Sequence, residues 1–149
     1  ELVGENKNQS LLDLYCGVGA FSFYASRFAR IVTGVEISSE AIDCAKMSSE
    51  LNKRKINFHA MDVDDFLKRG NTEFDSVVVN PPRRGLNLSI ISNLKKIKPK
   101  YIYYSSCNAE TMAEDYQELK EFYTIESLQI FDMFPYTNHF ETLMCLKQK

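Results

Sequence analysis

One cysteine in this sequence stands where a thiol could act as a nucleophile. Cys107 lies between an apolar run over residues 101–105 and a predicted helix over residues 109–122. The first backbone N–H groups of a helix, and its dipole, favour negative charge and so lower the pKa of a nearby thiol. A thiolate in this position could add covalently to an electrophilic substrate. The alternative is a buried free cysteine that packs as a small apolar side chain, which is the more common case.

A glycine turn followed by a carboxylate indicates a nucleotide-type binding site. Gly17 and Gly19 follow the first apolar run, and they let a ligand approach the backbone closely. Glu36 ends the second apolar run, where its carboxylate could accept hydrogen bonds from two ribose hydroxyls. The third glycine of the dinucleotide pattern is missing, and the turn has the form Asp13-x-x-Cys16-Gly17, so we expect S-adenosylmethionine rather than NAD. A purely structural turn is the alternative.

A rigid turn follows the fourth apolar run. Residues 80–83 read Asn-Pro-Pro-Arg, and two prolines in succession expose the Asn80 side chain at the edge of a sheet. Arg84 follows Arg83, and this pair of guanidinium groups suits a phosphate or the edge of a base. Amino-group methyltransferases carry an aromatic residue in place of Arg83, so that function is a weaker alternative here. The reading without function is a solvated basic turn.

The segment over residues 132–141 is dense in polar and aromatic side chains. Phe134 and Tyr136 could form the walls of a base-binding pocket, and Glu141 could act as a general base. His139 could equally be a loop histidine whose hydrogen bonds are satisfied, and Glu141 a surface carboxylate. This segment by itself does not distinguish the two interpretations.

All of these features follow predicted strands, as Asp62 does after the third one. Strands and helices alternate along the chain, which predicts a parallel, doubly wound α/β sheet whose ligands bind beyond the carboxyl ends of the strands. The last two strands are predicted to form a hairpin-like pair. We expect strands at residues 11–15, 31–36, 57–61, 74–79, 101–105, 123–131 and 141–146, and helices at 20–28, 40–53, 64–69, 89–96 and 109–122.

Length and composition narrow the class of protein. The 149 residues suit a single domain, and 44% hydrophobic with 26% charged residues predict a globular fold. No apolar run approaches the roughly 18 residues of a membrane span, and the polar start shows no signal peptide and indicates an excised part of a longer protein. Four widely spaced cysteines lack the spacing of a metal site and fit a reducing cytoplasm. A formal net charge of −2 argues mildly against a protein that grips nucleic acid by itself.

In combination the motifs resemble those of the RNA uracil-C5 methyltransferase family, whose members form 5-methyluridine in tRNA or 23S rRNA with S-adenosylmethionine. The resemblance covers almost the whole chain, about residues 11–146. It is strongest to the shorter bacterial branch that acts on a uridine in a 23S rRNA loop. It is carried by residues 13–17 (Asp-Leu-Tyr-Cys-Gly), 35–36 (Val-Glu), 80–85 (Asn-Pro-Pro-Arg-Arg-Gly), 106–108 (Ser-Cys-Asn) with Thr111, and 132–141 (Asp-Met-Phe-Pro-x-Thr-x-His-x-Glu).

The resemblance implies a fold and a reaction. The fold would be that of a Rossmann-like class I S-adenosylmethionine-dependent methyltransferase, with a mostly parallel seven-stranded sheet and a C-terminal antiparallel strand pair. Residues 1–149 would be the catalytic domain alone, without the upstream RNA-binding module and iron–sulfur cysteine cluster of some complete members. The reaction would transfer a methyl group to C5 of a uridine in RNA, with 23S rRNA as the first candidate and tRNA as the second. We expect a monomeric, cytoplasmic enzyme without a membrane contact or a metal in this segment.

The resemblance also implies roles for individual residues. Cys107 would be the nucleophile that adds to uracil C6, and Glu141 the base that removes the C5 proton. Other branches of the family carry Asp where this chain has Asn80, so we assign Asn80 no acid–base role. The cofactor site would be lined by Tyr15, Gly17, Glu36, Asp62 and Asn80, and the substrate would be contacted by Arg83, Phe134 and His139.

A further possibility is a folded domain that binds the cofactor or a partner without catalysis.

Overall fold

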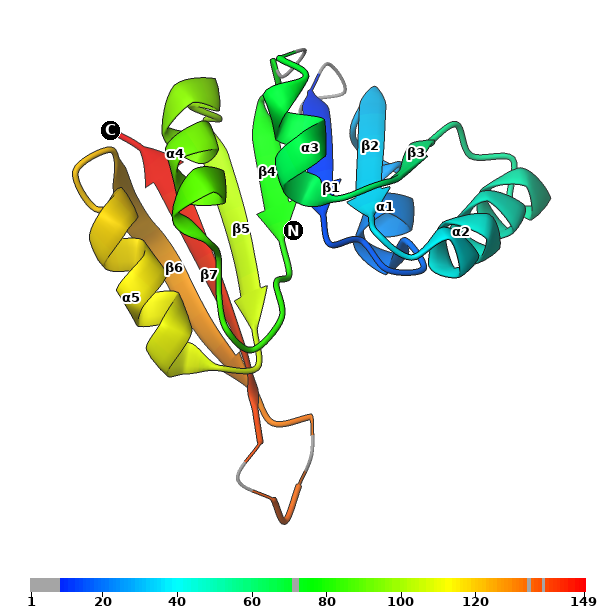
Figure 1. The fold of residues 1–149 in the computed structure, drawn as a ribbon. Helices are drawn as coiled ribbons and strands as arrows, with labels where there is room; N and C mark the ends of the chain where they lie inside the picture. The colour runs from blue at the N-terminus through cyan, green and yellow to red at the C-terminus, as the bar shows by residue number, and fades with distance from the viewer. Residues whose placement is uncertain (1–8, 71–72, 134, 138) are drawn as a thin grey trace.

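A seven-stranded sheet forms the middle layer of the molecule (Figure 1). The computed structural model describes residues 9–70, 73–133, 135–137 and 139–149. The strand order across the sheet is β3-β2-β1-β4-β5-β7-β6. The strands are β1 (Ser10–Leu14), β2 (Ile31–Glu36), β3 (Asn57–Ala60), β4 (Ser76–Val79), β5 (Tyr101–Ser106), β6 (Tyr123–Phe131) and β7 (Glu141–Gln148). The helices are α1 (Ala20–Ala25), α2 (Ser39–Leu51), α3 (Val63–Lys68), α4 (Leu88–Ile97) and α5 (Ala109–Leu119).

The strand pairing confirms the predicted fold class. Strands β1 to β5 pair in parallel, and β7 runs antiparallel to both of its neighbours, β5 and β6. The strand order reverses direction between β1 and β4, and open sheets of this kind bind ligands beyond the carboxyl ends at such a reversal. In Figure 1 these ends lie along the lower edge of the sheet, from which the segment between β6 and β7 projects.

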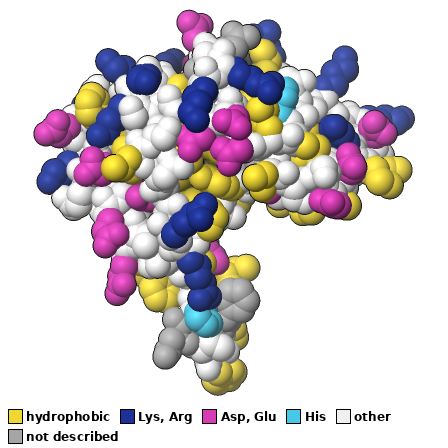
Figure 2. Space-filling view, viewed as in Figure 1, with side chains coloured by type: hydrophobic (Ala, Val, Ile, Leu, Met, Phe, Trp, Pro, Cys, Tyr) yellow, Lys and Arg dark blue, Asp and Glu magenta, His cyan; other side chains and the backbone are white. Residues whose placement is uncertain are grey.

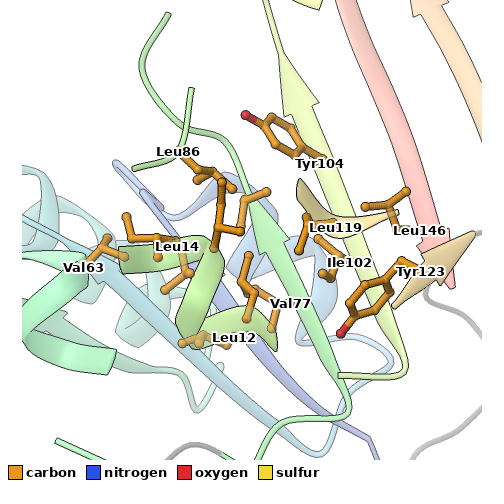
Figure 3. Close-up of a cluster of buried hydrophobic side chains, with 14 of the residues drawn as sticks. Leu12, Leu14, Val63, Val77, Leu86, Ile102, Tyr104, Leu119, Tyr123 and Leu146 are labelled. Atoms are coloured by element: carbon orange, nitrogen blue, oxygen red, sulfur yellow. The ribbon is translucent and has the colours of Figure 1, made fainter. Parts of the chain in front are cut away.

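Helices cover both faces of the sheet and bury two apolar clusters. Helices α3, α4 and α5 pack on one face over the larger cluster, part of which Figure 3 shows. Helix α1 packs on the other face, where Ala25 meets Leu11, Val32 and Val78. Each fully buried aliphatic side chain stabilises the fold by about 1.5–3 kcal/mol relative to exposure, so these clusters fix the helices against the strands. The larger cluster includes Leu12, Leu14, Val77, Val79, Ile102 and Tyr104 from strands, and Ile90, Leu94, Met112 and Leu119 from helices.

Local hydrogen bonds set where the helices begin and end. Helices α1 and α5 end at Ala25 and Leu119, earlier than predicted. At both places a backbone N–H bonds to a carbonyl three residues back, as Phe122 N does to Leu119 O at 2.9 Å, which closes a turn instead of extending the α-helix. Four helices begin after a residue whose side chain accepts a backbone N–H of the first turn. These N-cap residues are Ser38, Asp62, Asn87 and Asn108.

Two kinds of feature are absent from the described ranges. No helix in them is both long enough and apolar enough to cross a membrane. The same ranges hold no group of three or more His, Cys, Asp or Glu side chains that could bind a metal ion. All four cysteines are free thiols.

Candidate active site

A cavity of about 360 Å³ lies at the carboxyl ends of β1 and β4, where the strand order reverses. Tyr15, Glu36, Asp62 and Asn80 all line it. The backbone N–H of Gly17 donates to Glu36 Oε2 at 3.2 Å, which places the glycine turn beside the same carboxylate. The structure therefore brings together all five residues that the sequence predicts for a cofactor site. We call this space the cofactor cavity.

Backbone hydrogen bonds fix the orientation of the Glu36 carboxylate. Oε1 accepts from the N–H of Ser38 at 3.0 Å, and Oε2 accepts from that of Gly17 at 3.2 Å. A carboxylate oxygen has two lone pairs, so both oxygens can still accept hydrogen bonds from ligand hydroxyls. Ile37, which is 69% exposed, also lines the cavity and offers apolar surface next to the carboxylate. The cavity volume and this donor set fit a nucleoside-containing cofactor such as S-adenosylmethionine.

Tyr15 adopts a backbone conformation that bulky residues rarely take. Its φ is 61°, in the left-handed region. Such a conformation costs about 1–3 kcal/mol and persists where the surrounding structure imposes it, often at functional sites. Burial, with smaller effects from the Asp62 and Asp64 carboxylates, raises the pKa of the Tyr15 hydroxyl to about 12. Tyr15 therefore presents a neutral hydroxyl to the cavity.

Asp13 stabilises the glycine turn through hydrogen bonds to α1. This residue is fully buried, and its Oδ2 accepts from Ser22 N at 2.9 Å and from Ser22 Oγ at 2.6 Å. Burial raises the pKa of Asp13 to about 6 against these two hydrogen bonds, and its Oδ1 has no hydrogen-bond partner. The bonds tie α1 to the end of β1, and they thereby hold residues 15–19 in place.

A second cavity, of about 420 Å³, is lined by Asn80 and Glu141. Glu141 is the first residue of β7 and is half-buried. Asn80 lines this cavity as well as the cofactor cavity, so this residue lies where the two meet. We call this space the base cavity. Its other lining residues are Phe21, Ser105, Phe131, Met133, Thr142 and Leu143.

The pairing of β5 with β7 brings Cys107 and Glu141 to the same end of the two strands. The last pair of this antiparallel ladder is Ser106 with Thr142, so the next position along each strand is Cys107 on one and Glu141 on the other. Side chains alternate between faces, and Ser105 and Leu143, which share a face with that next position, line the base cavity. Cys107 itself is half-buried and is not among the residues lining the cavity. The sheet nevertheless brings the predicted nucleophile and base to one edge.

The loop that carries Cys107 is bonded to residues 80–87, which we call the lip. The side-chain amide of Asn108 donates to the carbonyl of Arg83 at 3.1 Å, and Thr111 Oγ1 donates to the same carbonyl at 3.2 Å. Arg83 thus contributes its backbone to the joint, while its side chain is exposed. Arg84, which the sequence interpretation paired with Arg83 and did not place in the cofactor site, lines the cofactor cavity. Figure 2 shows basic side chains in this part of the surface, just above the projecting β6–β7 segment.

The start of α5 has fewer free backbone N–H groups for Cys107 than the sequence predicts. Asn108 caps the helix, and its side-chain oxygen accepts from the N–H groups of Glu110 at 3.1 Å and Thr111 at 3.4 Å. Those two donors are therefore occupied by the cap. Cys107 lies one residue before the cap, where the helix dipole still favours negative charge.

Of the aromatic residues predicted in the β6–β7 segment, the described Tyr136 and His139 line neither cavity. Phe134 lies outside the described residues. His139 is exposed, and its backbone N–H donates to Thr137 Oγ1 at 3.2 Å. Tyr136 is fully exposed at a φ of 69°. The described aromatic walls of the base cavity are instead Phe21 of α1 and Phe131 of β6.

Phe131 could have been found from the sequence, whereas Phe21 could not. Phe131 pairs with Glu141 across the β6–β7 ladder, and it directly precedes the motif over residues 132–141. Phe21 lies on α1, far from that motif in the sequence, and it reaches the cavity only because α1 packs beside β1.

The strand order, the glycine turn and the cofactor cavity define a Rossmann-like methyltransferase of the S-adenosylmethionine-dependent class. Comparison with known families agrees. A model described as methyltransferase small domain matches residues 1–96. The chain belongs to the tRNA (uracil-5-)-methyltransferase family, whose model matches residues 54–149.

Individual relatives match the chain over nearly all of its length. The 23S rRNA (uracil(747)-C(5))-methyltransferase RlmC of Xenorhabdus nematophila is 46% identical over 145 residues, which are 97% of this chain and 38% of that protein. The enzyme of the same name from Pectobacterium atrosepticum is 45% identical over 147 residues, 98% of this chain and 39% of that protein. The chain therefore spans about two fifths of the length of these curated relatives.

A solved structure shares the fold closely. The tRNA (uracil-54, C5)-methyltransferase of Pyrococcus abyssi, solved in complex with S-adenosyl-L-homocysteine, superposes with a TM-score of 0.85 at 34% identity. The match covers 97% of this chain and 36% of that one.

Proposed function

We propose that the protein containing this chain transfers a methyl group from S-adenosylmethionine to C5 of a uridine in RNA, with 23S rRNA as the first candidate substrate. The observation that carries the proposal is the position of Asn80, which lines both the cofactor cavity and the base cavity. A methyl donor in one cavity would meet a base in the other at this residue. The names of the relatives support uridine C5 in 23S rRNA as the acceptor.

Residues of the cofactor cavity hold the donor under this proposal. Glu36, fixed by two backbone N–H groups, accepts hydrogen bonds from ribose hydroxyls, and Ile37 offers apolar surface to the adenine. Asp62 lies on the same wall and can accept a hydrogen bond from an amino group of the ligand. When bound, S-adenosylmethionine supplies an electrophilic methyl group on a sulfonium.

Cys107 and Glu141 carry out the covalent steps of the proposal. The Cys107 thiolate adds to uracil C6, which forms a C–S bond and leaves C5 with the electron density of an enolate. C5 would then form a bond to the methyl carbon as the sulfonium S–CH3 bond breaks, with a neutral thioether as the leaving group. Glu141 removes the remaining C5 proton, the C–S bond breaks, and the thiolate leaves with the bonding electrons. Support for this pair comes from the β5–β7 register, because Cys107 and Glu141 each lie next to a member of the last pair, Ser106 with Thr142.

The target uridine has to leave its base stack to reach the base cavity. Phe21 and Phe131 offer apolar surface against a flipped base, and the Asn80 amide can both donate and accept hydrogen bonds with it. Under the proposal residues 1–149 are the catalytic domain. Their net charge of −2 leaves most phosphate contacts to the additional length that the relatives have.

A suicide substrate tests substrate class and mechanism together. The natural full-length polypeptide is incubated with S-adenosylmethionine and a 23S rRNA fragment that contains 5-fluorouridine. Fluorine at C5 cannot leave as a proton does, so a stable protein–RNA adduct at Cys107 is expected, mapped by mass spectrometry. Methylation of unmodified RNA on a nitrogen, or C5 methylation without an adduct, contradicts the proposal.

A further inference from the structure

A buried carboxylate on α5 joins three elements beside the predicted nucleophile. Asp115 is 7% exposed, and its Oδ2 accepts from the Tyr104 hydroxyl at 2.5 Å and from the backbone N–H of Leu86 at 2.8 Å. Tyr104 belongs to β5, and Leu86 belongs to the lip. Burial and the bond to Asp115 raise the pKa of the Tyr104 hydroxyl, so Tyr104 keeps its proton and stays a donor.

The lip lies directly against α5 at this carboxylate. Gly85 has a φ of 75°, and a Cβ added to it would lie 2.7 Å from Asp115 Oδ2 and 3.2 Å from Thr111 Cβ. Glycine is therefore needed here both for its backbone conformation and for the close approach. One turn earlier on α5, Thr111 donates to the Arg83 carbonyl at 3.2 Å. Two positions of α5 thus hold two successive parts of the lip.

The far end of the lip is fixed to the cofactor side. Asn87 caps α4, and its side-chain amide donates to Asp64 Oδ2 at 2.7 Å. Asp64 lies in the first turn of α3, two residues after Asp62 of the cofactor cavity. The lip, which begins with Asn80, is therefore bonded to the helix that follows Cys107 and to the helix that follows Asp62.

We propose that Asp115 is a positioning residue, whose carboxylate, held by Tyr104, sets the distance between Cys107 and the Asn80 junction of the two cavities. The inference rests on the proposed function, because it concerns the geometry of the same reaction. Asp115 lines neither cavity and touches no reacting atom. It acts through Leu86 and the lip, and through the helix that starts after Cys107.

A pair of tyrosine variants separates positioning from general stability. Tyr104 and Tyr123 are both fully buried, and each donates its hydroxyl to one protein acceptor, Asp115 Oδ2 for Tyr104 and the Pro99 carbonyl at 3.1 Å for Tyr123. In Figure 3 the two rings lie apart, with Leu119 and Ile102 drawn between them. Y104F and Y123F each remove one buried hydroxyl, so each is expected to lower Tm by about 2–4 °C. Only Y104F removes a hydrogen bond to Asp115, the residue that holds the lip.

The rate of adduct formation with 5-fluorouridine RNA, per folded molecule and at saturating S-adenosylmethionine, is the readout. For D115A we expect a loss of about 10–100-fold in this rate, because a displacement of about 1 Å can cost that much. Y104F should lose about fivefold, the equivalent of one hydrogen bond, and Y123F should match the wild type. D115N keeps an acceptor for Leu86 N and Tyr104, so it should recover most of the rate that D115A loses.

Equal rates for Y104F, Y123F and the wild type would overturn the positioning role, as would a loss in Y123F as large as in Y104F. If D115A does not fold, the two tyrosine variants and D115N decide the question. A wild-type protein that forms no adduct at all refutes the proposed function itself. A wild-type protein that forms the adduct, with variants that form it equally fast, refutes only the role of Asp115.

Discussion

The cofactor cavity and the base cavity meet at Asn80 but are built differently. The cofactor cavity takes four of its polar side chains from positions within two residues of the ends of four parallel strands, as Tyr15 and Glu36 illustrate. The base cavity is walled by α1, β5, β6 and β7, and it is largely apolar around Glu141. Local sequence position fixes the first set, while antiparallel register and helix packing fix the second. Mutations should therefore affect cofactor binding and base chemistry separately.

Removal of the Cys107 thiol should give the largest difference between the effect on methyl transfer and the effect on cofactor binding. In the full-length polypeptide, C107A is expected to lower methyl transfer by about 10⁴-fold or more, because no other nucleophile replaces the thiolate. Affinity for S-adenosylmethionine should stay within about twofold, since Cys107 does not line the cofactor cavity. Tritium release from C5-labelled uridine RNA and calorimetry measure the two effects. C44A, which alters an exposed thiol on α2, is the control, and normal turnover by C107A would show that the nucleophile is misassigned.

Substitution of Glu141, the proposed general base, should stop the reaction at a later step. E141Q is expected to allow one methyl transfer and then to accumulate the covalent protein–RNA adduct, with turnover lowered by about 10²–10⁴-fold. A band of retarded mobility on a denaturing gel detects the adduct. E126Q is the matched control, because Glu126 lies on β6 and pairs with Lys147 at 3.3 Å. Full turnover of E141Q without an adduct would place the base elsewhere.

Loss of the Glu36 carboxylate should affect the cofactor cavity alone. E36A is expected to weaken S-adenosylmethionine binding by about 10–100-fold, the equivalent of one hydrogen bond to a charged group. Calorimetry measures this loss directly. The control is E40A, because Glu40 is an exposed carboxylate on the first turn of α2 that bonds only to groups near its own position. Equal losses in E36A and E40A would mean that overall charge, rather than the cavity, holds the cofactor.

The smallest expected effect concerns the lip that lies between the two cavities. Gly85 and Gly70 have nearly equal φ angles, 75° and 76°, but only Gly85 has atoms within contact of an added Cβ. Both G85A and G70A force alanine into the left-handed region, while G85A also overpacks against Asp115. G85A should therefore lower the free energy of unfolding by about 1–3 kcal/mol more than G70A, measured by chemical denaturation. Equal losses would show that the lip yields at this point.

Much of the cofactor side could be predicted from the sequence, and the base side only in part. Glu36 and Asn80 were identified because each follows an apolar run, and parallel strands collect such positions at one edge. The bounds of β2 and β6 were predicted correctly for the same local reason. Phe21 was missed because its place in the base cavity depends on how α1 packs. Arg84 was not placed in the cofactor cavity because a turn sequence does not reveal which side chain faces a cavity.

The sequence by itself determined the alternation of strands and helices, the polar residues at the strand ends and the family to which they belong. These are properties of short stretches, governed by periodicity, capping and turn chemistry. The tertiary structure decided that β7 lies between β5 and β6 in the register that brings Cys107 and Glu141 to one edge. It also decided that Asp115 joins Tyr104 to the lip. Both depend on pairings between distant residues, and only the packed sheet and helices specify which pairings form.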